Sequence, residues 1–498
     1  MKVLFIHTDI HRFDPEDYGF DGLIGWGSMQ LGISYISSCL KKRGHSSSLL
    51  FINRRAWEER VLNRVKNYKP GILCFGGVST QFKHVLRISR FLKERFPEIY
   101  QVYGGVHATL AELKLENLPF DAVCRGEGEA PMIELAERLT RDESPKEIMN
   151  LTVKQKGRIF SNSTRPFFRD LDRIPFPDRE MWGEYIDPAR FNKHAILASR
   201  GCPFECSYCS NKALRRVSEG QYVRFRNPEV VIDEVRFIKK EYPGTNDIFF
   251  ESETLTTNLP WLEKFCGKLS KLNSFLTGSL KFGTNMRITP GTDYSRVFEI
   301  LKNAGFEYIA IGIESGSEKV RRDILGRNYS NEDIITVFRK AKDEGLRPHA
   351  YNMIGLPGES IDDFRETIKI NRACEPEDPH LSVFFPYPQT DLFKVCAEKG
   401  YLRKNLDLLE EREDAALNMK SFPPRKIEEY HAGFEWHVYR GKKSAFSLFC
   451  RYLFKKYIVK HKVTLRIYLF FRKLFGKNEN KNPRNTDGDI PDTTYTLW

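Results

Sequence analysis

The segment SRGCPFECSYCS, residues 199–210, holds three of the ten cysteines of this 498-residue chain. Cys202, Cys206 and Cys209 have the spacing C-x3-C-x2-C, and no fourth cysteine lies nearby. Thiolates at such spacings let one loop wrap an iron–sulfur cube, and three of them leave one iron open to another ligand. A zinc site would need a further Cys or His at finger spacing, and only His194 is close. The spacing predicts a 4Fe-4S cluster with an open iron, with zinc and chance as the alternatives.

The composition is that of an ordinary globular protein, with 41% hydrophobic and 29% charged residues, and it excludes wholesale disorder. No uncharged apolar run approaches the ~18 residues of a membrane span. The first apolar run, residues 3–6, is too short for a secretory signal. We therefore expect a cytoplasmic protein, in which cysteines serve metal or redox chemistry rather than disulfides. The other cysteines are expected to be small buried side chains: Cys39, Cys74, Cys124, Cys266, Cys374, Cys396 and Cys450.

Residues 1–145 alternate short apolar runs with helical patterns, which predicts an α/β domain with a doubly wound, Rossmann-like parallel sheet. The expected strands are 3–6, 48–52, 71–75 and 100–103, and the expected helices are 30–43 and 85–96. In such sheets the ligand crevice lies outside the carboxyl ends of the strands. Glycine-containing turns follow there, at 76–77, 104–105 and 126–129. Together they indicate a binding face.

A second βα series follows a proline-rich stretch, residues 146–190, which reads as a linker. Six expected strands with helices between them predict a partial (β/α)6 barrel over residues 191–400, with its chemistry at the carboxyl-terminal rim. The expected strands are 195–199, 247–251, 280–284, 308–313, 348–354 and 380–385; the helices between them include 229–241, 295–304, 331–344 and 361–372.

Residues 401–477 are predicted to be a small, basic helical C-terminal region, and residues 478–498 a disordered tail. Segment 440–477 has 12 basic and no acidic residues, so most of the net charge of +13 lies there. One interpretation is a helical cap whose aromatic side chains pack on the barrel. Another is an interfacial anchor on anionic lipid at the inner face of the membrane. Nucleic acid is the least favoured partner because no base-reading module is visible.

Several motifs beyond the cysteine loop resemble those of the radical S-adenosylmethionine (SAM) superfamily, in the branch with an N-terminal cobalamin (B12)-binding domain. In the second half they are GIESGSE at 312–318, Arg327, IGLPGE at 354–359 and FPYP at 385–388. In the first half, similar residues stand at 31–32, 43–45, 104–109 and 126–129. The resemblance covers about residues 1–400, and its motifs are specific in combination.

The resemblance implies three cofactors: a 4Fe-4S cluster on Cys202, Cys206 and Cys209, SAM on its open iron, and cobalamin. The residues that the resemblance places near SAM are Tyr208, Glu253, Glu314, Arg327 and Gly355. Those that it places near cobalamin are Gly76, Gly77, Ser79, Gly104, Gly105, His107, Gly126, Glu127, Gly128 and Glu129. It identifies no catalytic residue beyond the cluster.

Two departures from the family pattern stand out. A pair of aspartates often follows the second barrel strand, whereas this chain has Glu251, Ser252 and Glu253 there. The Asp-x-His-x-x-Gly motif, which supplies a histidine ligand to cobalt, is also absent. Some members of the branch also lack this motif and bind cobalamin without a protein histidine ligand, so cobalamin remains the expectation. The alternative is a degenerate domain that is kept for structure.

The activity that the resemblance implies is cleavage of SAM to a 5′-deoxyadenosyl radical, followed by methyl transfer to an unactivated centre of a small-molecule, lipid-like or amphiphilic substrate. The electron would come from an external donor such as flavodoxin or ferredoxin. One alternative is a ring-forming or oxidising enzyme of the same fold. Another is an RNA methylthiotransferase, which needs a second cluster, yet Cys39 and Cys74 fall in helix and strand patterns. A non-enzymatic corrinoid or cluster carrier is a further alternative, against which Glu314 and the glycine motifs argue.

Overall fold

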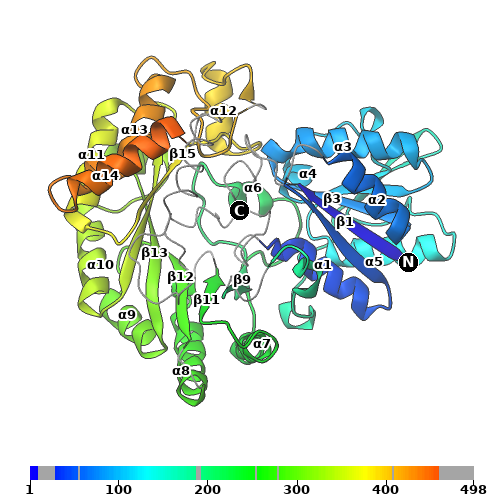
Figure 1. Ribbon diagram of the computed structural model, residues 1–498, viewed down its shortest axis with the longest axis horizontal. Coiled ribbons are helices and arrows are strands. Elements are labelled where there is room, and N and C mark those ends of the chain that lie inside the picture. The colour runs from blue at the N-terminus through cyan, green and yellow to red at the C-terminus, as the bar shows by residue number, and fades with distance from the viewer. Residues whose placement is uncertain are drawn as a thin grey trace, which may run out of the picture.

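The computed structural model describes residues 1–8, 29–53, 57–186, 192–252, 255–276, 280–406 and 409–458. They form two α/β units that lie side by side in Figure 1, the N-terminal one in blue and cyan and the C-terminal one in green to orange. Glu253 and the tail predicted to be disordered, 478–498, fall outside the described residues.

The first sheet has the doubly wound topology that the sequence predicts. Its strand order is β2-β1-β3-β4-β5-β6-β7, with β1 to β5 parallel. Helices α1 and α5 pack on one face of the sheet, and α2 and α3 pack on the other. The elements are β1 (Lys2–Thr8), α1 (Leu31–Lys42), β2 (Ser46–Ile52), α2 (Glu58–Tyr68), β3 (Ile72–Gly76), α3 (Phe82–Arg95), β4 (Tyr100–Gly104), α4 (Val106–Leu110), β5 (Ala122–Cys124) and α5 (Glu129–Thr140).

The structure differs from the linker predicted over residues 146–190. Strands β6 (Leu151–Gln155) and β7 (Arg158–Ser161) extend the first sheet as an antiparallel edge. Trp182 and Tyr185 are buried in the core of the same unit. Prolines flank the β6–β7 hairpin rather than interrupt it. The proline-rich composition of the whole stretch therefore predicts a linker even though it contains two short strands.

The second sheet is the predicted partial barrel of six parallel strands, ordered β15-β14-β13-β12-β11-β8 with β8 and β15 at its edges. Helices α7 to α11 cover its outer side around a core of Ile, Phe, Leu and Val side chains. The elements are β8 (Lys193–Leu197), α7 (Pro228–Glu241), β11 (Asp247–Glu251), α8 (Leu259–Phe275), β12 (Lys281–Arg287), α9 (Tyr294–Asn303), β13 (Phe306–Glu314), α10 (Asn331–Asp343), β14 (Arg347–Ile354), α11 (Ile361–Cys374) and β15 (Pro379–Val383).

A polar and aromatic cluster fills the amino-terminal end of the barrel. The Tyr308 hydroxyl donates to Asp247 at 2.8 Å, and the Lys193 ammonium lies 4.9 Å from the Tyr308 ring centroid. A Cβ on Gly283 would come within 2.2 Å of the same ring, so glycine there makes room for it. Because this end is filled, the carboxyl-terminal rim is where a ligand can enter.

The described part of the C-terminal region packs on the barrel. Helix α12 (Asp391–Glu398) is followed by α13 (Pro424–Tyr439), which contacts β15 and α11, and by α14 (Ala445–Leu453). The Tyr439 hydroxyl donates to the Pro376 carbonyl at 2.5 Å. The helices thus cover the open edge of the sheet at β15. Within the described residues, no helix has both the length and the apolarity needed to cross a membrane.

Buried histidines give the fold a defined pH dependence. Burial lowers the pKa of His107 and His349 to about 4 and that of His380 to about 3. The unfolded chain takes up protons at these imidazoles below pH ~6.5, whereas the folded chain does not until near pH ~4. We expect the free energy of unfolding to decrease as the pH falls through this window, by up to about 1.4 kcal/mol per pH unit for each histidine.

Denaturant unfolding at neutral and mildly acidic pH measures this loss. The variant His349→Gln, which has no imidazole to protonate, should show a shallower pH dependence than the unsubstituted chain. If the free energy of unfolding of that variant depends on pH as steeply as that of the unsubstituted chain, His349 does not contribute to the pH dependence.

Candidate active site

The cysteine segment leaves the barrel after β8 and the two-residue strand β9 (Ser199–Arg200) and ends at α6 (Ser210–Leu214). Gly201 has φ +82°, and a Cβ at this position would lie 2.3 Å from the Tyr222 carbonyl oxygen. Only glycine fits such a left-handed position with the backbone so close. This turn redirects the chain from β9 into the cysteine loop.

The three cysteines of the loop differ in burial. Cys206 is buried, and Cys202 and Cys209 are half-buried. The Arg287 guanidinium, at the end of β12, donates to the Cys206 sulfur and stacks 4.0 Å from the Phe204 ring centroid. A fixed positive charge therefore lies beside the loop, in contact with one of its three sulfur atoms.

In the part of the chain that the structure describes, no group of three or more His, Cys, Asp or Glu side chains is placed so that it could hold a single metal ion. An iron–sulfur cube differs from such a site because each of its thiolate ligands bonds a different iron atom. One loop that presents three sulfurs beside a cation, with no fourth protein thiolate, fits that donor set.

Six of the seven other cysteines are buried as predicted, but Cys450 on α14 is exposed, which corrects the expectation for that residue. Burial raises the pKa of the Cys39 thiol to about 11 and that of Cys124 to about 12. These thiols are inert core side chains at neutral pH.

Three of the residues expected near SAM meet beside the loop. The Arg327 guanidinium binds the Glu314 carboxylate at 2.9 Å and donates to the Tyr208 hydroxyl at 2.6 Å. Glu314 and Arg327 are both less than a tenth exposed. Burial and the neighbouring charge of Glu314 raise the pKa of Tyr208 well above its usual value, against the opposing effect of Arg327. The sequence does not predict that these three side chains contact one another.

Glu314 has a strained backbone. It ends β13 with φ +64°, at a register shift between β13 and β14. A Cβ on Gly312 would lie 2.5 Å from the Glu314 carboxylate, so that glycine allows the side chain to fold back along its own strand. A non-glycine residue in the left-handed region costs on the order of 1–3 kcal/mol and is typical of functional sites.

The IGLPGE motif forms a turn at the end of β14 that encloses a carboxylate. Gly355 has φ +82°, and its N–H donates to Glu359 at 2.7 Å while the Leu356 N–H donates at 3.1 Å. Burial raises the pKa of Glu359 to about 8, although both N–H groups oppose that rise. The prediction named Gly355 but missed Glu359, whose complete burial no local pattern signals.

After β11, the structure describes the first two residues of the expected acidic stretch. Glu251 and Ser252 are buried, and the Ser252 hydroxyl lies 2.6 Å from that of Ser199. Ser252 therefore links the second strand to the segment that leads into the cysteine loop. Glu253 is not among the described residues.

The turns after β3 and β4 pack against each other. Gly105 has φ +94°, and a Cβ there would lie 3.3 Å from the Gly77 nitrogen. The Ser79 hydroxyl lies 2.9 Å from His107 Nδ1, and His107 Nε2 is buried without a hydrogen-bond partner among the described residues. A small cavity joins these turns to the start of α6 and to the FPYP motif; it is lined by Val78, Ser79, Val106, His107, Leu110, Ser210, Tyr387 and Pro388.

The GEGE stretch that opens α5 also faces the barrel. Gly126 has φ +79°, and its N–H donates to the Thr109 hydroxyl at 3.0 Å. The carboxylates of Glu127 and Glu129 bind Arg200 of β9, at 3.0 and 2.6 Å. Both carboxylates therefore contact the barrel unit.

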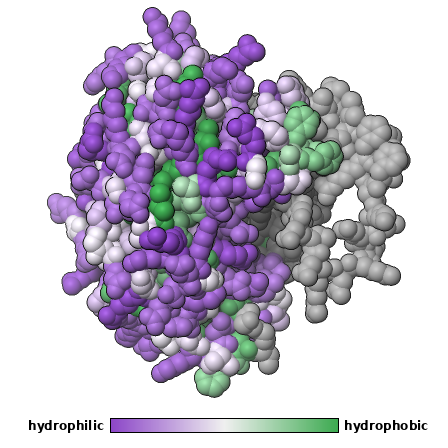
Figure 2. Space-filling view, turned by 90° about the vertical axis from the view of Figure 1, so that its left-hand side faces the viewer, coloured by the Kyte–Doolittle hydropathy of each residue, from purple (hydrophilic) through white to green (hydrophobic). Residues whose placement is uncertain are grey.

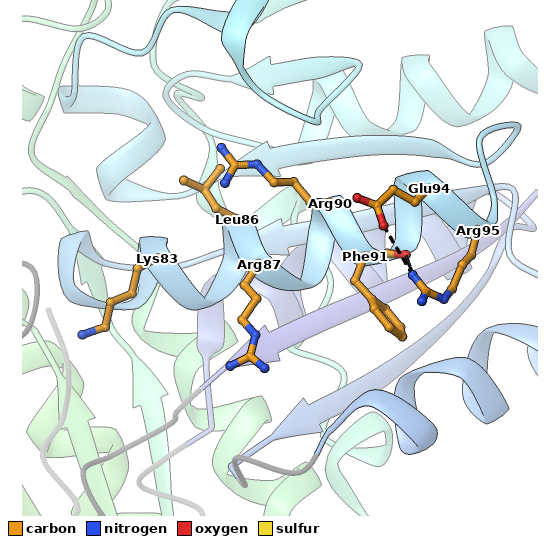
Figure 3. Close-up of a pocket in the computed structure, with 7 residues that line it drawn as sticks. All are labelled: Lys83, Leu86, Arg87, Arg90, Phe91, Glu94 and Arg95. Carbon is orange, nitrogen blue, oxygen red and sulfur yellow. Dashed lines mark hydrogen bonds and ion pairs between the residues drawn. The ribbon is translucent and has the colours of Figure 1, made fainter.

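A separate shallow depression lies on the outward side of α3 (Figure 3) and is lined by Lys83, Leu86, Arg87, Arg90, Phe91, Glu94 and Arg95. The inward side of the same helix, with Val85, Ile88 and Leu92, packs on the sheet. The depression contains no cysteine and none of the strand-end turns, so we do not include it in the site.

Comparison with known families agrees with this geometry. The sequence model of the Radical SAM superfamily matches residues 196–370, and that of the B12 binding domain matches residues 28–136. The first range contains the cysteine loop, Glu314, Arg327 and Gly355. The second contains all the expected cobalamin residues.

Among curated relatives, the anaerobic magnesium-protoporphyrin IX monomethyl ester cyclase of Rubrivivax gelatinosus is 26% identical over 412 residues, 80% of this chain and 70% of its own. An uncharacterized methyltransferase of Pyrococcus horikoshii is 24% identical over 439 residues, 86% of this chain and 90% of its own. Among solved structures, the cobalamin-dependent SAM radical enzyme OxsB with aqua-cobalamin bound has a TM-score of 0.66 at 15% identity, over 95% of this chain and 75% of its own. At that identity the likeness concerns the fold.

The loop cysteines can be tested by iron content. We expect Cys209→Ser to reduce the iron bound after anaerobic reconstitution from about four per chain to well below one, because a cube held by three thiolates loses a third of its protein ligands. Cys450→Ser is the matched control, since its thiol is exposed and lies outside the loop. Equal iron loading in the two variants would contradict the cluster assignment.

Proposed function

Because the chain belongs to the radical SAM superfamily, in the branch with a B12-binding domain, we propose that it methylates an unactivated centre of a small-molecule or lipid-like substrate. The supporting observation is the position of the cysteine loop between the two units. Tyr208 of this loop contacts Arg327 in the barrel, and α6 at the loop's end contacts α4 of the N-terminal unit.

When bound, the three cofactors supply the reductive cleavage of SAM and a transferable methyl group. The protein supplies ligands, charge and a dry site. Cys202, Cys206 and Cys209 hold the cluster, and Arg287 stabilises the negative charge of the thiolates. An electron donor such as flavodoxin or ferredoxin delivers the electron.

Two groups on the barrel rim suit the polar end of SAM. The Glu314 carboxylate can accept a further hydrogen bond while Arg327 balances its charge, and Arg327 can face a ligand carboxylate. Gly355 follows β14 at the same rim, where its N–H is bound to Glu359. By the family resemblance, the backbone of Tyr208 would lie against the adenine of SAM.

For cobalamin, we propose the face formed by the turns after β3, β4 and β5. His107 Nε2 is a buried polar atom with no partner among the described residues. Burial keeps this imidazole neutral at physiological pH, so it can donate or accept a hydrogen bond. Gly76 and Gly104 leave space for a ligand because a Cβ on either would meet only one heavy atom within 4 Å, and that at 3.7 Å or more.

Ring closure or oxidation without methyl transfer is a second candidate function. It is favoured by the cyclase of Rubrivivax gelatinosus, which matches 80% of this chain. An RNA methylthiotransferase is less favoured, although a putative methylthiotransferase of Methanocaldococcus jannaschii is 24% identical over 377 residues, 72% of this chain and 76% of its own. Such an enzyme needs a second cluster, whereas Cys39 and Cys74 are buried in the core.

Methyl-deuterated SAM distinguishes these reactions. We expect the reconstituted chain with cobalamin and a reductant to pass the labelled methyl group to a product, as measured by mass spectrometry. A product without label would exclude methyl transfer and leave ring closure or oxidation. Cobalamin that does not co-purify with the full chain after anaerobic loading would contradict both.

We also propose peripheral contact of segment 440–477 with an anionic membrane surface, which would bring the site to an amphiphilic substrate. Two aromatic side chains of α14 are exposed to solvent: Phe446 is 79% exposed and Phe449 is 47% exposed. By contrast, the face of the molecule in Figure 2 is mostly hydrophilic. Arg451 and Lys455 bind Glu435 at 3.2 and 2.7 Å, so part of the described charge is already balanced. Basic residues around exposed aromatic rings favour an anionic interface.

Co-sedimentation of the full chain with phosphatidylglycerol vesicles tests this contact. We expect Phe446→Ser with Phe449→Ser to weaken binding about tenfold or more, since each ring contributes on the order of 1.5–3 kcal/mol when buried. Phe275→Ser is the matched control, because Phe275 is 84% exposed on α8, far along the chain from the basic segment. Equal binding to neutral phosphatidylcholine vesicles would contradict an electrostatic contact.

A further inference from the structure

Two arginines stand directly opposite each other, one just before the cysteine loop and one after it. Arg200 of β9 pairs with Arg224 of β10 (Arg224–Phe225) in an antiparallel ribbon of only two residues per strand. Like charges at opposed positions destabilise a strand pair. Because the ribbon is so short, the repulsion between the two arginines must be offset by residues outside it.

The N-terminal unit supplies that compensation. Glu127 binds Arg200 at 3.0 Å and Arg224 at 2.9 Å, and Glu129 binds Arg200 at 2.6 Å. Two carboxylates thus balance two guanidinium groups, and Arg224 is only about 5% exposed. Charge-assisted pairs with this geometry are about twice as strong as neutral hydrogen bonds.

Neighbouring groups hold both sides of this arrangement in place. The Phe168 N–H donates to Glu127 at 2.7 Å, and Arg224 donates to the Phe168 carbonyl at 2.8 Å. The Arg200 guanidinium lies 5.4 Å from the ring centroid of Tyr35 on α1. Burial acts to raise the pKa of Glu127, but the two arginines and the Phe168 N–H outweigh it and hold the pKa below its ordinary value.

We propose that Glu127 and Glu129 are positioning residues that fix the cysteine loop relative to the N-terminal unit. We call this four-residue group, Glu127, Glu129, Arg200 and Arg224, the interdomain clamp. Arg200 lies one residue before the Gly201 turn and two before Cys202. Because Arg200 is bound to Glu129 at the start of α5, the position of α5 constrains the position of the first cysteine. The clamp thereby sets where the loop lies between the barrel and the strand-end turns.

This role differs from the cobalamin contact that the family resemblance implies for the GEGE stretch. Glu127 already accepts hydrogen bonds from two arginines and a backbone N–H. Arginine does not deprotonate in proteins, so the ion pairs of Glu127 with Arg200 and Arg224 are not broken by loss of a proton from the arginine. The carboxylates act through the loop instead of touching a cofactor.

Hydrogen–deuterium exchange on the full chain without cofactors tests the clamp independently of the proposed reaction. We expect Glu129→Arg and Arg200→Glu each to speed exchange of residues 199–210 about tenfold or more, because each leaves a like-charge pair in a poorly solvated site. The double variant restores opposite charges between positions 129 and 200, although the new carboxylate at 200 still faces Glu127, which Arg224 continues to pair with. We therefore expect its exchange to be slower than that of either single variant, as expected of directly coupled residues.

Asp233→Asn is the control, since it removes an exposed ion pair with Arg236 on α7. If a charge reversal prevents folding, Glu129→Gln keeps the size of the side chain and should give a smaller increase in the same segment. Unchanged exchange in the single variants, or a double variant no better than the worse single one, would overturn the clamp.

A spectroscopic measurement separates positioning of the loop from general stability. In the reconstituted, reduced chain, we expect Glu129→Gln to alter the change in the cluster's EPR signal on addition of SAM, with iron content preserved. An EPR response identical to that of the unsubstituted chain would overturn the positioning role. If the unsubstituted chain shows no cluster signal, the proposed function fails while the exchange experiment still decides on the clamp.

Discussion

The buried ion pair of Glu314 and Arg327 is the interaction on which the geometry of the site depends. Both side chains lie at the rim of the barrel, where loss of water costs each charge several kcal/mol unless the partner is well placed. Arg327 also donates to the Tyr208 hydroxyl, so the pair connects the end of β13 to the cysteine loop. A pair with this desolvation cost is weak support for stability. Its place beside the loop supports our proposal that it serves ligand binding.

The loop is held from both sides by charge. In the barrel it contacts Arg327 and Arg287, and toward the N-terminal unit it continues from Arg200 of the interdomain clamp. Hydrophobic packing builds a core in each unit and a small cluster between them, in which Tyr35 and Cys39 of α1 meet Leu197 of β8. Directional ion pairs and hydrogen bonds orient the loop between the two units. Such contacts specify an orientation that non-directional apolar burial cannot.

Local patterns in the sequence predict much of the fold. The apolar runs at 3–6 and 248–250 lie within β1 and β11, because a strand buried on both faces needs a continuous apolar stretch. The hairpin of β6 and β7 escaped prediction since its prolines lie outside it. Cys450 escaped because the residue type alone does not report exposure.

The sequence by itself determined the two α/β units, the cysteine spacing and the motifs that point to SAM and cobalamin, since these depend on period and spacing along the chain. Only the tertiary structure decided which side chains meet. Glu127 and Arg200 are 73 positions apart, and Arg327 and Tyr208 are 119 apart. Such pairs form only when two units, or a loop and a distant strand end, come together in the folded chain. No local pattern records that, because each partner alone looks like an ordinary charged or aromatic surface residue.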